Sequence, residues 1–338
     1  MASRPSKAMK IENTSRQVST CDQLSKLPDS IIIHILSFLP TFDAVYRAGF
    51  VSKRFVSLRL SLPSLVFRNK DIPFRQEDKL SRYINDVLVS QHRDNLRRCC
   101  FHIPYHPRDD HELIDTWIKL TLDRKVKELE ISLVRSNFRR YYLYCLPRFL
   151  FRNEILTSLS LSRVGFKVAK EMQINWKSLK SLSMKRITDL NDDMLGKILI
   201  GCPILELLEL KSCEGIHKLD VVSQCLKELV IYDCVSSYKR GEILRVSAPS
   251  LRVLVISGSN HYNECTLENL SSLVEATIDS DSDSDSDGDD NNGEDENEDD
   301  EDGYEYDDGI DFFGSVQHVK KLTLLGTWNL HVSIYYFM

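Results

Sequence analysis

Three histidines in one short stretch, His102, His106 and His111, are the residues of this chain whose types could ligate a metal together with Asp109 and Asp110. Imidazole nitrogens and carboxylate oxygens are common zinc ligands, but their spacing here fits none of the recurrent zinc ligand frames. The nine cysteines contain no CxxC pair either. We therefore expect a charged loop here, and predict no metal and no cofactor.

The sequence motifs of nucleotide binding and of common hydrolytic chemistry do not occur in the chain. It contains no GxGxxG, GxxxxGK, GxSxG or HExxH, although each of these marks a specific arrangement of backbone and side chains. His34 lies within an apolar helical stretch and is interpreted as a partly covered helix residue. We predict no catalytic residues, so that the protein is not an enzyme and its function is binding.

The cysteines and the apolar runs indicate the compartment. An odd number of cysteines without paired spacings favours reduced, mostly buried thiols over a disulfide framework. Residues 1–20 are polar and basic and lack the apolar core of a secretory signal, and no run approaches the about 18 apolar residues of a membrane span. We expect an intracellular protein of the nucleus, the cytoplasm or both, with no membrane contact.

A strongly acidic segment separates the charge of the chain into two parts. Of the 50 acidic residues, 18 lie between 279 and 308, where there is no Lys or Arg, so 32 remain elsewhere against 44 basic residues. The net charge of −6 thus hides a basic remainder of +12. We expect residues 279–309 to form a disordered insertion, because they repel one another and have little to bury.

Two interpretations of the acidic insertion stay open. The first is a solvated insertion with no defined role. The second is a phosphorylated segment, because four serines are each followed by an acidic residue and are suited to an acid-directed kinase. These serines are Ser280, Ser282, Ser284 and Ser286.

The basic stretch from Arg135 to Arg152 is interleaved with aromatic residues, a pattern that nucleic-acid-binding surfaces share. Leu143, Leu146 and Leu150 nevertheless fall at helical spacing, and Pro147 interrupts them. We favour a packed insertion with a basic rim and do not expect nucleic-acid binding.

The most informative N-terminal stretch is LPDSIIIHILSFLP at residues 27–40. Pro28 suits the first position of a helix, Asp29 complements the dipole there, and Pro40 ends it. Large apolar residues cover more than the single stripe that an ordinary surface helix buries. A second helix capped by Thr41 and a third from about Ser52 would leave a very small core. Part of this unit should therefore face a partner.

A repeated LxxLxL pattern runs through the second half of the chain. Its copies start at Val126, Leu156, Leu179, Leu205, Leu226, Leu251, Leu273 and Val319. The intervals are close to the 20 to 29 residues of leucine-rich repeats, except where the acidic insertion lengthens the last one. In each copy the LxL leucines share one face of a short strand and the leading residue fills the coil. Segments such as 192–200 supply helices on the convex side, and Cys213 and Cys234 occupy structural turn positions.

The N-terminal stretch, followed by VSKRF at 51–55, resembles the F-box of plant F-box proteins, with Phe55 where that family usually has Trp. The resemblance implies binding to the SKP-type adaptor of a cullin-based ubiquitin ligase. The residues that it places in the adaptor contact are Leu27, Pro28, Ile32, Ile35, Leu39, Pro40, Val51 and Lys53.

The repeats, with Cys202-Pro203 leading into one of them, resemble those of plant F-box/leucine-rich-repeat proteins, many of which continue into an FBD domain. This chain reaches Met338 soon after Trp328, where that family continues, so the FBD segment is expected to be incomplete. The family implies an α/β solenoid, in which an N-terminal three-helix F-box precedes an irregular leucine-rich-repeat horseshoe with a parallel sheet on its concave face.

The function implied by the resemblance is substrate recognition in an SCF-type (SKP-cullin-F-box) ubiquitin ligase, with an unidentified protein substrate. The middle residue of each LxL points outward on the concave face, and we predict that it contacts the substrate. This row consists of Glu130, Ser160, Ser183, Glu209, Val230, Val255, Thr277 and Thr323. Two alternatives are a non-ligase interaction scaffold and a small-molecule co-receptor solenoid.

The predicted domain organisation follows from these segments. We expect a disordered tail at 1–20, the F-box at 21–67, linking helices at 68–122, and the solenoid at 123–338 with its acidic insertion at 279–309. Within the linking part, apolar spacing predicts helices over 77–91 and 111–122 and a short strand over 99–103.

Overall fold

The computed structural model describes the chain in nine segments. They are residues 26–71, 77–91, 96–106, 110–135, 143–166, 172–234, 242–258, 262–280 and 318–326. The predicted N-terminal tail, nearly all of the acidic insertion and the end of the chain lie outside these segments. In the part described, no helix has both the length and the apolar character needed to cross a membrane.

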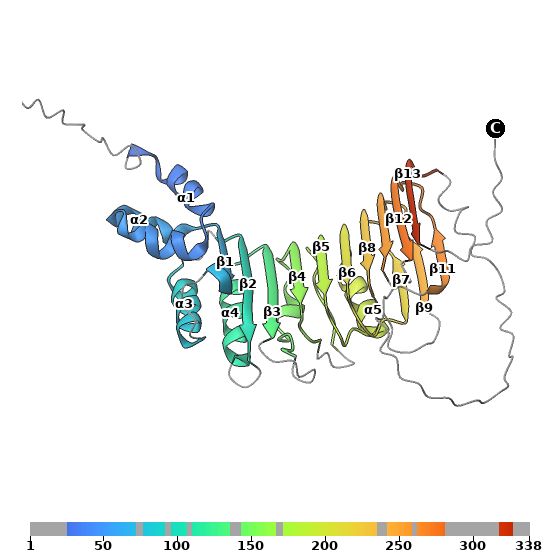
Figure 1. Cartoon of the computed structure of the whole chain (residues 1–338), viewed down its shortest axis with the longest axis horizontal. Helices are drawn as coiled ribbons and strands as arrows, with labels where there is room; N and C mark the ends of the chain where they lie inside the picture. Colours follow the sequence, from blue (N-terminus) through green and yellow to red (C-terminus); the bar gives the residue numbers. More distant parts are fainter. Residues whose placement is uncertain are drawn as a thin grey trace, which may run out of the picture.

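A small helical unit occupies one end of the molecule (Figure 1). It consists of α1 (Asp29–Ser37), a π-helical turn η2 (Asp43–Arg47), a 3₁₀ turn η3 (Ala48–Phe50), α2 (Lys53–Leu58) and a 3₁₀ turn η4 (Arg59–Ser61). Its three predicted helices are present, although the second is irregular.

Two predicted helix starts need correction. Pro28 is the N-cap of α1 rather than its first helical residue, and its carbonyl accepts from the N–H groups of Ile31 and Ile32. Thr41 does not cap the second helix. Its buried hydroxyl accepts a 2.6 Å hydrogen bond from the backbone N–H of Val66, which joins the helical unit to the first strand. This strand was not among the elements predicted from the sequence.

Ten parallel strands form one curved sheet that follows the helical unit (Figure 1). In spatial order they are β1 (Ser64–Arg68), β2 (Arg98–Tyr105), β3 (Glu128–Arg135), β4 (Ser158–Ser162), β5 (Ser181–Lys185), β6 (Leu207–Lys211), β8 (Glu228–Tyr232), β10 (Val253–Ser257), β12 (Glu275–Ser280) and β13 (Lys321–Gly326). The predicted LxL segments supply eight of them. β12 and β13 pair directly, so the acidic insertion separates adjacent strands of the sheet.

A repeated hydrogen bond fixes the register of this sheet. Just before each strand, one carbonyl accepts from two successive N–H groups of the next coil. For example, the carbonyl of Lys180 accepts from Glu206 and Leu207, and that of Glu206 accepts from Lys227 and Glu228. Because every coil repeats this contact, the leucines of successive strands lie side by side. The continuous core follows from this register.

A left-handed residue follows the end of five strands of the ten-stranded sheet. Arg163, Arg186, Ser212, Asp233 and Gly258 all have positive φ, and the first four donate their N–H to the last strand residue of the next coil. Non-glycine residues adopt this conformation at some cost. Gly258 has a steric reason as well, since a Cβ there would lie 2.7 Å from the backbone nitrogen of Asp233.

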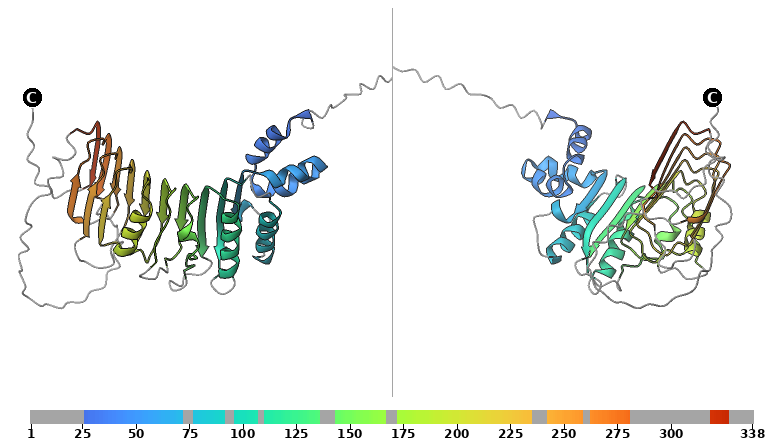
Figure 2. Two further views of the ribbon diagram at one scale, coloured as in Figure 1. Left: turned by 180° about the vertical axis from the view of Figure 1, so that it is seen from behind. Right: turned by 45° about the vertical axis from the view of Figure 1, so that its right-hand side comes forward.

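A second layer covers the core side of the sheet (Figure 2). It contains α4 (His111–Asp123), η6 (Leu150–Arg152) and α5 (Asp192–Gly201), then a three-stranded parallel sheet of β7 (Lys218–Val222), β9 (Glu242–Ser247) and β11 (Tyr262–Glu268). α5 confirms the helix predicted on the convex side. Later coils form β7, β9 and β11 there instead, because alternating buried residues such as Leu219 and Val221 suit a strand.

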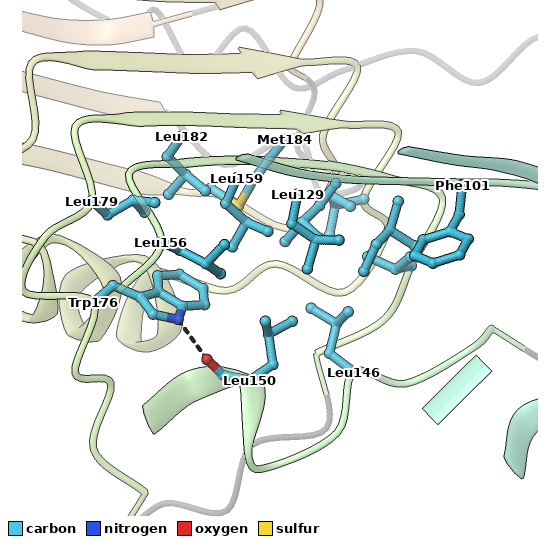
Figure 3. Close-up of a cluster of buried hydrophobic side chains, with 14 of the residues drawn as sticks. Phe101, Leu129, Leu146, Leu150, Leu156, Leu159, Trp176, Leu179, Leu182 and Met184 are labelled. Carbon is cyan, nitrogen blue, oxygen red and sulfur yellow. Dashed lines mark hydrogen bonds between the residues drawn. The ribbon is translucent and has the colours of Figure 1, made fainter. Parts of the chain in front are cut away.

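The hydrophobic core runs between the two layers (Figure 3). The leading residues of the repeats and the LxL leucines fill it, as predicted, except that Leu322 and Leu324 on β13 are about 40% exposed. Trp176 is fully buried, and its indole N–H donates a 2.8 Å hydrogen bond to the carbonyl of Leu150. Within the basic stretch, Tyr144, Leu146 and Phe151 are buried too, which agrees with a packed insertion.

The region predicted as linking helices belongs to the solenoid itself. α3 (Glu77–Ser90), β2 and α4 match the predicted helices and strand. However, β1 and β2 are the first two strands of the ten-stranded sheet, so the sheet begins at Ser64 and not after residue 122. These two strands lack the LxxLxL pattern because Phe67, Cys99 and Phe101 take the inward positions of leucines.

Candidate functional site

Large apolar side chains are exposed on the helical unit. Phe38 is 75% exposed and Phe50 is 89% exposed, although both belong to a domain with a small core. We call the full set the helical apolar surface, which comprises Ile31, Ile35, Phe38, Leu39, Phe50, Val51 and Val56. Large apolar side chains exposed together on one small domain are typical of an interaction site.

The structure exposes most of the residues that the F-box resemblance places in the adaptor contact. Pro28, Ile35, Leu39, Pro40, Val51 and Lys53 are exposed, and Leu27 is half-buried against the core. The placement of Ile32 in the adaptor contact needs correction, because Ile32 is only 1% exposed and packs with Leu36 inside the unit. Residues four apart share one face of a helix, so Ile32 belongs to the core face and its neighbour Ile31 to the exposed one.

An ion pair fixes the orientation of α1 against α2. The Arg54 guanidinium donates to the carboxylate of Asp29, with a distance of 2.8 Å from Nε to Oδ1, and to the carbonyl of Leu27 at 2.7 Å. Arg59 supports the next turn by donating to the carbonyl of Val45. Arg54 of α2 and Arg59 of η4 therefore hold the segments that carry the helical apolar surface.

The predicted substrate-contact residues lie in one row on the concave face. The pairing register places Glu130, Ser160, Ser183 and Glu209 opposite one another, and the row continues through Val230, Val255, Thr277 and Thr323. Side chains alternate between the two faces of a strand, and the residues on either side of each are LxL residues of the core side. The row therefore faces away from the core, as predicted.

An ionic cluster occupies the N-terminal part of this row. Glu130 accepts from Nε2 of His102 across 3.2 Å and from Arg98 across 3.3 Å. The bond from His102, with those from Cys100 and Arg98, lowers the pKa of Glu130 to about 2 despite its partial burial. Burial, with the neighbouring carboxylate, raises the pKa of the Cys100 thiol to about 12.

A second ionic cluster lies further along the same face. Glu209 accepts from the hydroxyl of Ser183 and pairs with Lys211 at 2.6 Å and Lys185 at 3.2 Å. Burial alone would raise the pKa of Glu209, but these three hydrogen bonds outweigh it and lower the pKa to about 2. The carboxylate is thus ionised throughout the physiological range.

Beyond Glu209 the central row is apolar on β8 and β10 and becomes polar again, at Thr277 and Thr323, on β12 and β13. Val230 and Val255 continue the central row, and Leu207, Tyr232 and Val253 flank them on the same face. Along its length the face therefore carries the Glu130 cluster, serines on β4 and β5, the Glu209 cluster, valines on β8 and β10, and an ion pair between Glu275 and Lys321. Such a broad surface of mixed polarity suits a protein ligand better than a small molecule.

The structure places His102, His106 and His111 against three different carboxylates. His106 faces Asp110 and His111 faces Asp115, whereas Asp109 lies outside the described residues. His102 instead joins Cys100 and Glu130, a set that the sequence prediction missed. The Cys-x-His spacing on a strand was the available signal, since residues two apart share a face.

Two family models match this chain, one over the helical unit and one over the repeats. Residues 24–58 match the family model of the F-box domain. Residues 114–275 match the model described as FBD-associated F-box protein At5g56370, LRR repeats. No solved structure matches.

Several curated Arabidopsis thaliana proteins are similar to this chain. F-box protein At5g03100 is 31% identical over 265 residues, which is 76% of each protein. Putative F-box/LRR-repeat protein At5g02930 is 30% identical over 82% of this chain and 55% of its own length, and putative FBD-associated F-box protein At5g56440 is 28% identical over 76% and 59%. The chain thus spans little more than half the length of two of these relatives.

Proposed function

The chain belongs to the family of plant F-box proteins with leucine-rich repeats, and we propose that it is the substrate-recognition subunit of an SCF-type ubiquitin ligase. The observation that carries this proposal is the helical apolar surface on an F-box domain. In the proposed complex this surface binds the SKP-type adaptor and, through it, the cullin. The solenoid then holds a protein substrate.

The exposed side chains give the adaptor contact its driving force. Fully burying a side chain such as Phe, Leu, Ile or Val contributes about 1.5–3 kcal/mol relative to leaving it in water. Phe38 and Phe50 are the most exposed members of the surface and lie at the ends of α1 and η3. We propose that they contribute to adaptor binding beside Pro28, Ile35, Leu39, Pro40, Val51 and Lys53.

The solenoid supplies the second binding surface. We propose that the substrate contacts the row from Glu130 to Thr323, which the parallel register keeps on one face. The chain itself performs no chemistry in this scheme. It raises the local concentration of substrate lysines near the enzyme carried by the cullin, and tethering of this kind reaches effective concentrations on the order of millimolar.

The adaptor contact can be tested with one exposed residue and a matched control. Phe50→Ser removes an 89% exposed aromatic side chain, so we expect adaptor affinity to fall by about tenfold or more with no loss of stability. Ile200→Ser is the control, because Ile200 is 84% exposed on α5, away from the helical unit. Affinity is measured by co-purification and calorimetry with an SKP-type adaptor.

The outcomes separate the ligase from the scaffold interpretation. A folded wild-type chain that binds no SKP-type adaptor would overturn the ligase assignment and leave an interaction scaffold. Equal losses for Phe50→Ser and Ile200→Ser would show that the contact is not on the helical apolar surface. Proximity labelling under proteasome inhibition, with wild type and Phe50→Ser compared, would then identify substrates that accumulate.

A further inference from the structure

Three potential metal ligands converge at the N-terminal end of the concave face. They come from two adjacent strands, Cys100 and His102 on β2 and Glu130 on β3. The Sγ atom of Cys100, a ring nitrogen of His102 and a carboxylate oxygen of Glu130 all lie within 4.8 Å of one another. In the part of the chain that the structure describes, this is the one group of its kind.

The strand geometry accounts for the convergence. Cys100 and His102 are two residues apart and so share a face of β2. Parallel pairing sets Cys100 beside Glu130 on β3, and Nε2 of His102 lies 3.2 Å from Oε1 of Glu130. Each ligand is thus positioned by a strand within the sheet and not by a loop.

The burial of the thiol is unusual for its position. Cys100 is in the row that faces away from the core, yet only 1% of its surface is exposed. Its strand neighbour Cys99 instead points to the core and lies 3.7 Å from the hydroxyl of Thr121. The side chains on the concave face therefore cover Cys100, and they include polar groups suited to metal coordination.

We propose that Cys100, His102 and Glu130 form a binding site for a divalent cation of the zinc class, with three protein ligands and a fourth position open to the concave face. Thiolate, imidazole and carboxylate are all ligands that zinc accepts, and three protein ligands leave one position for water or for a group of a bound protein.

The surrounding charges are compatible with this site. Binding of the cation releases the proton of the Cys100 thiol to solvent, and the resulting thiolate and the Glu130 carboxylate together balance the two charges of the cation. Arg98 donates to the other carboxylate oxygen, Oε2, at 3.3 Å, which leaves Oε1 directed at His102. Binding replaces the hydrogen bond between His102 and Glu130 by two bonds to the metal, and Arg98 acts as an outer partner that orients the carboxylate.

Cobalt(II) titration of the full chain tests the site, because thiolate coordination gives a charge-transfer absorption and tetrahedral coordination gives intense visible bands. We expect one cobalt per chain with both signals, and displacement by zinc. Cys100→Ser should abolish the thiolate band, and His102→Gln and Glu130→Gln should weaken cobalt binding by about tenfold or more.

Matched controls keep the test specific. Cys225→Ser removes a thiol that is more accessible than that of Cys100, and Glu128→Gln removes a carboxylate two residues away on β3 that faces Arg97 and Arg98. Neither should change the spectrum by much. A wild-type chain without a thiolate band, or a band that persists in Cys100→Ser, would overturn the site. Neither result depends on adaptor binding, so the site and the ligase assignment stand or fail separately.

Discussion

Arg54 of α2 reaches across the helical unit to Asp29, the first residue of α1, and its guanidinium also donates to the carbonyl of Leu27. The side chains of this pair are partly exposed, so the ion pair itself contributes little to stability. Its effect is on geometry. Asp29 and Leu27 lie at the start of the helix that carries Ile31, Ile35 and Phe38, and Arg54 fixes the angle of that helix against α2.

Arg54→Gln should therefore affect adaptor binding more than folding. We expect the free energy of unfolding to fall by about 1 kcal/mol or less, and adaptor affinity to fall several-fold because α1 is less constrained. Urea unfolding and calorimetry with the adaptor measure the two quantities. Arg47→Gln serves as the comparison, since its guanidinium pairs within its own helical segment with Asp43. A large stability loss without an affinity change would contradict this role.

Trp176→Phe should destabilise the solenoid by about 2–3 kcal/mol. The change removes the hydrogen bond to the carbonyl of Leu150 and leaves a small cavity in the core. Trp117→Phe is a matched control, because Trp117 is also buried but its indole nitrogen has no hydrogen-bond partner in the structure. We expect Trp117→Phe to lower the free energy of unfolding by less than Trp176→Phe does. Urea unfolding followed by circular dichroism gives both values, and equal costs would argue against the Trp176 hydrogen bond.

Gly258→Ala should destabilise the turn after β10 by about 1–3 kcal/mol. The residue has φ of +95°, and a Cβ would meet the backbone of Asp233. Gly196→Ala provides the opposite case, because Gly196 lies within α5 and a Cβ there meets nothing within 4 Å. We expect a gain of about 0.5–1 kcal/mol for that change. Thermal unfolding of the two variants should shift in opposite directions.

The Glu209 cluster predicts an acid-sensitive concave face. Because the folded pKa of Glu209 is about 2, below the unfolded value near 4.5, its stabilising contribution is complete above the unfolded value and is lost as pH falls toward 2. Glu209→Gln should therefore flatten the dependence of the unfolding midpoint on pH in that window. Glu228→Gln, at an exposed position on β8, should keep the wild-type slope. Identical slopes in both variants would count against the cluster.

The local pattern of residues was enough to predict the repeat and its faces. LxL places two leucines on one side of a strand whatever the rest of the chain does, so the core leucines and the row from Glu130 to Thr323 followed from spacing alone. The first F-box helix was predictable for the same reason, since Pro28 and Asp29 lie at its start and Pro40 follows shortly after its end.

Only the tertiary structure decided contacts between residues distant in sequence. Ile32 and Ile31 are equally apolar, and packing against Leu36 and the rest of the unit determines which of them is buried. Thr41 is a residue type that often caps helices, but in the folded chain its hydroxyl accepts a hydrogen bond from the N–H of Val66 on β1. β1 and β2 joined the sheet without the leucine pattern, because backbone pairing requires a register and not a particular side chain. The same pairing places Glu130 beside Cys100 and His102, which lie about 30 residues away in sequence. The spacing of residues within one strand cannot predict a contact with another strand.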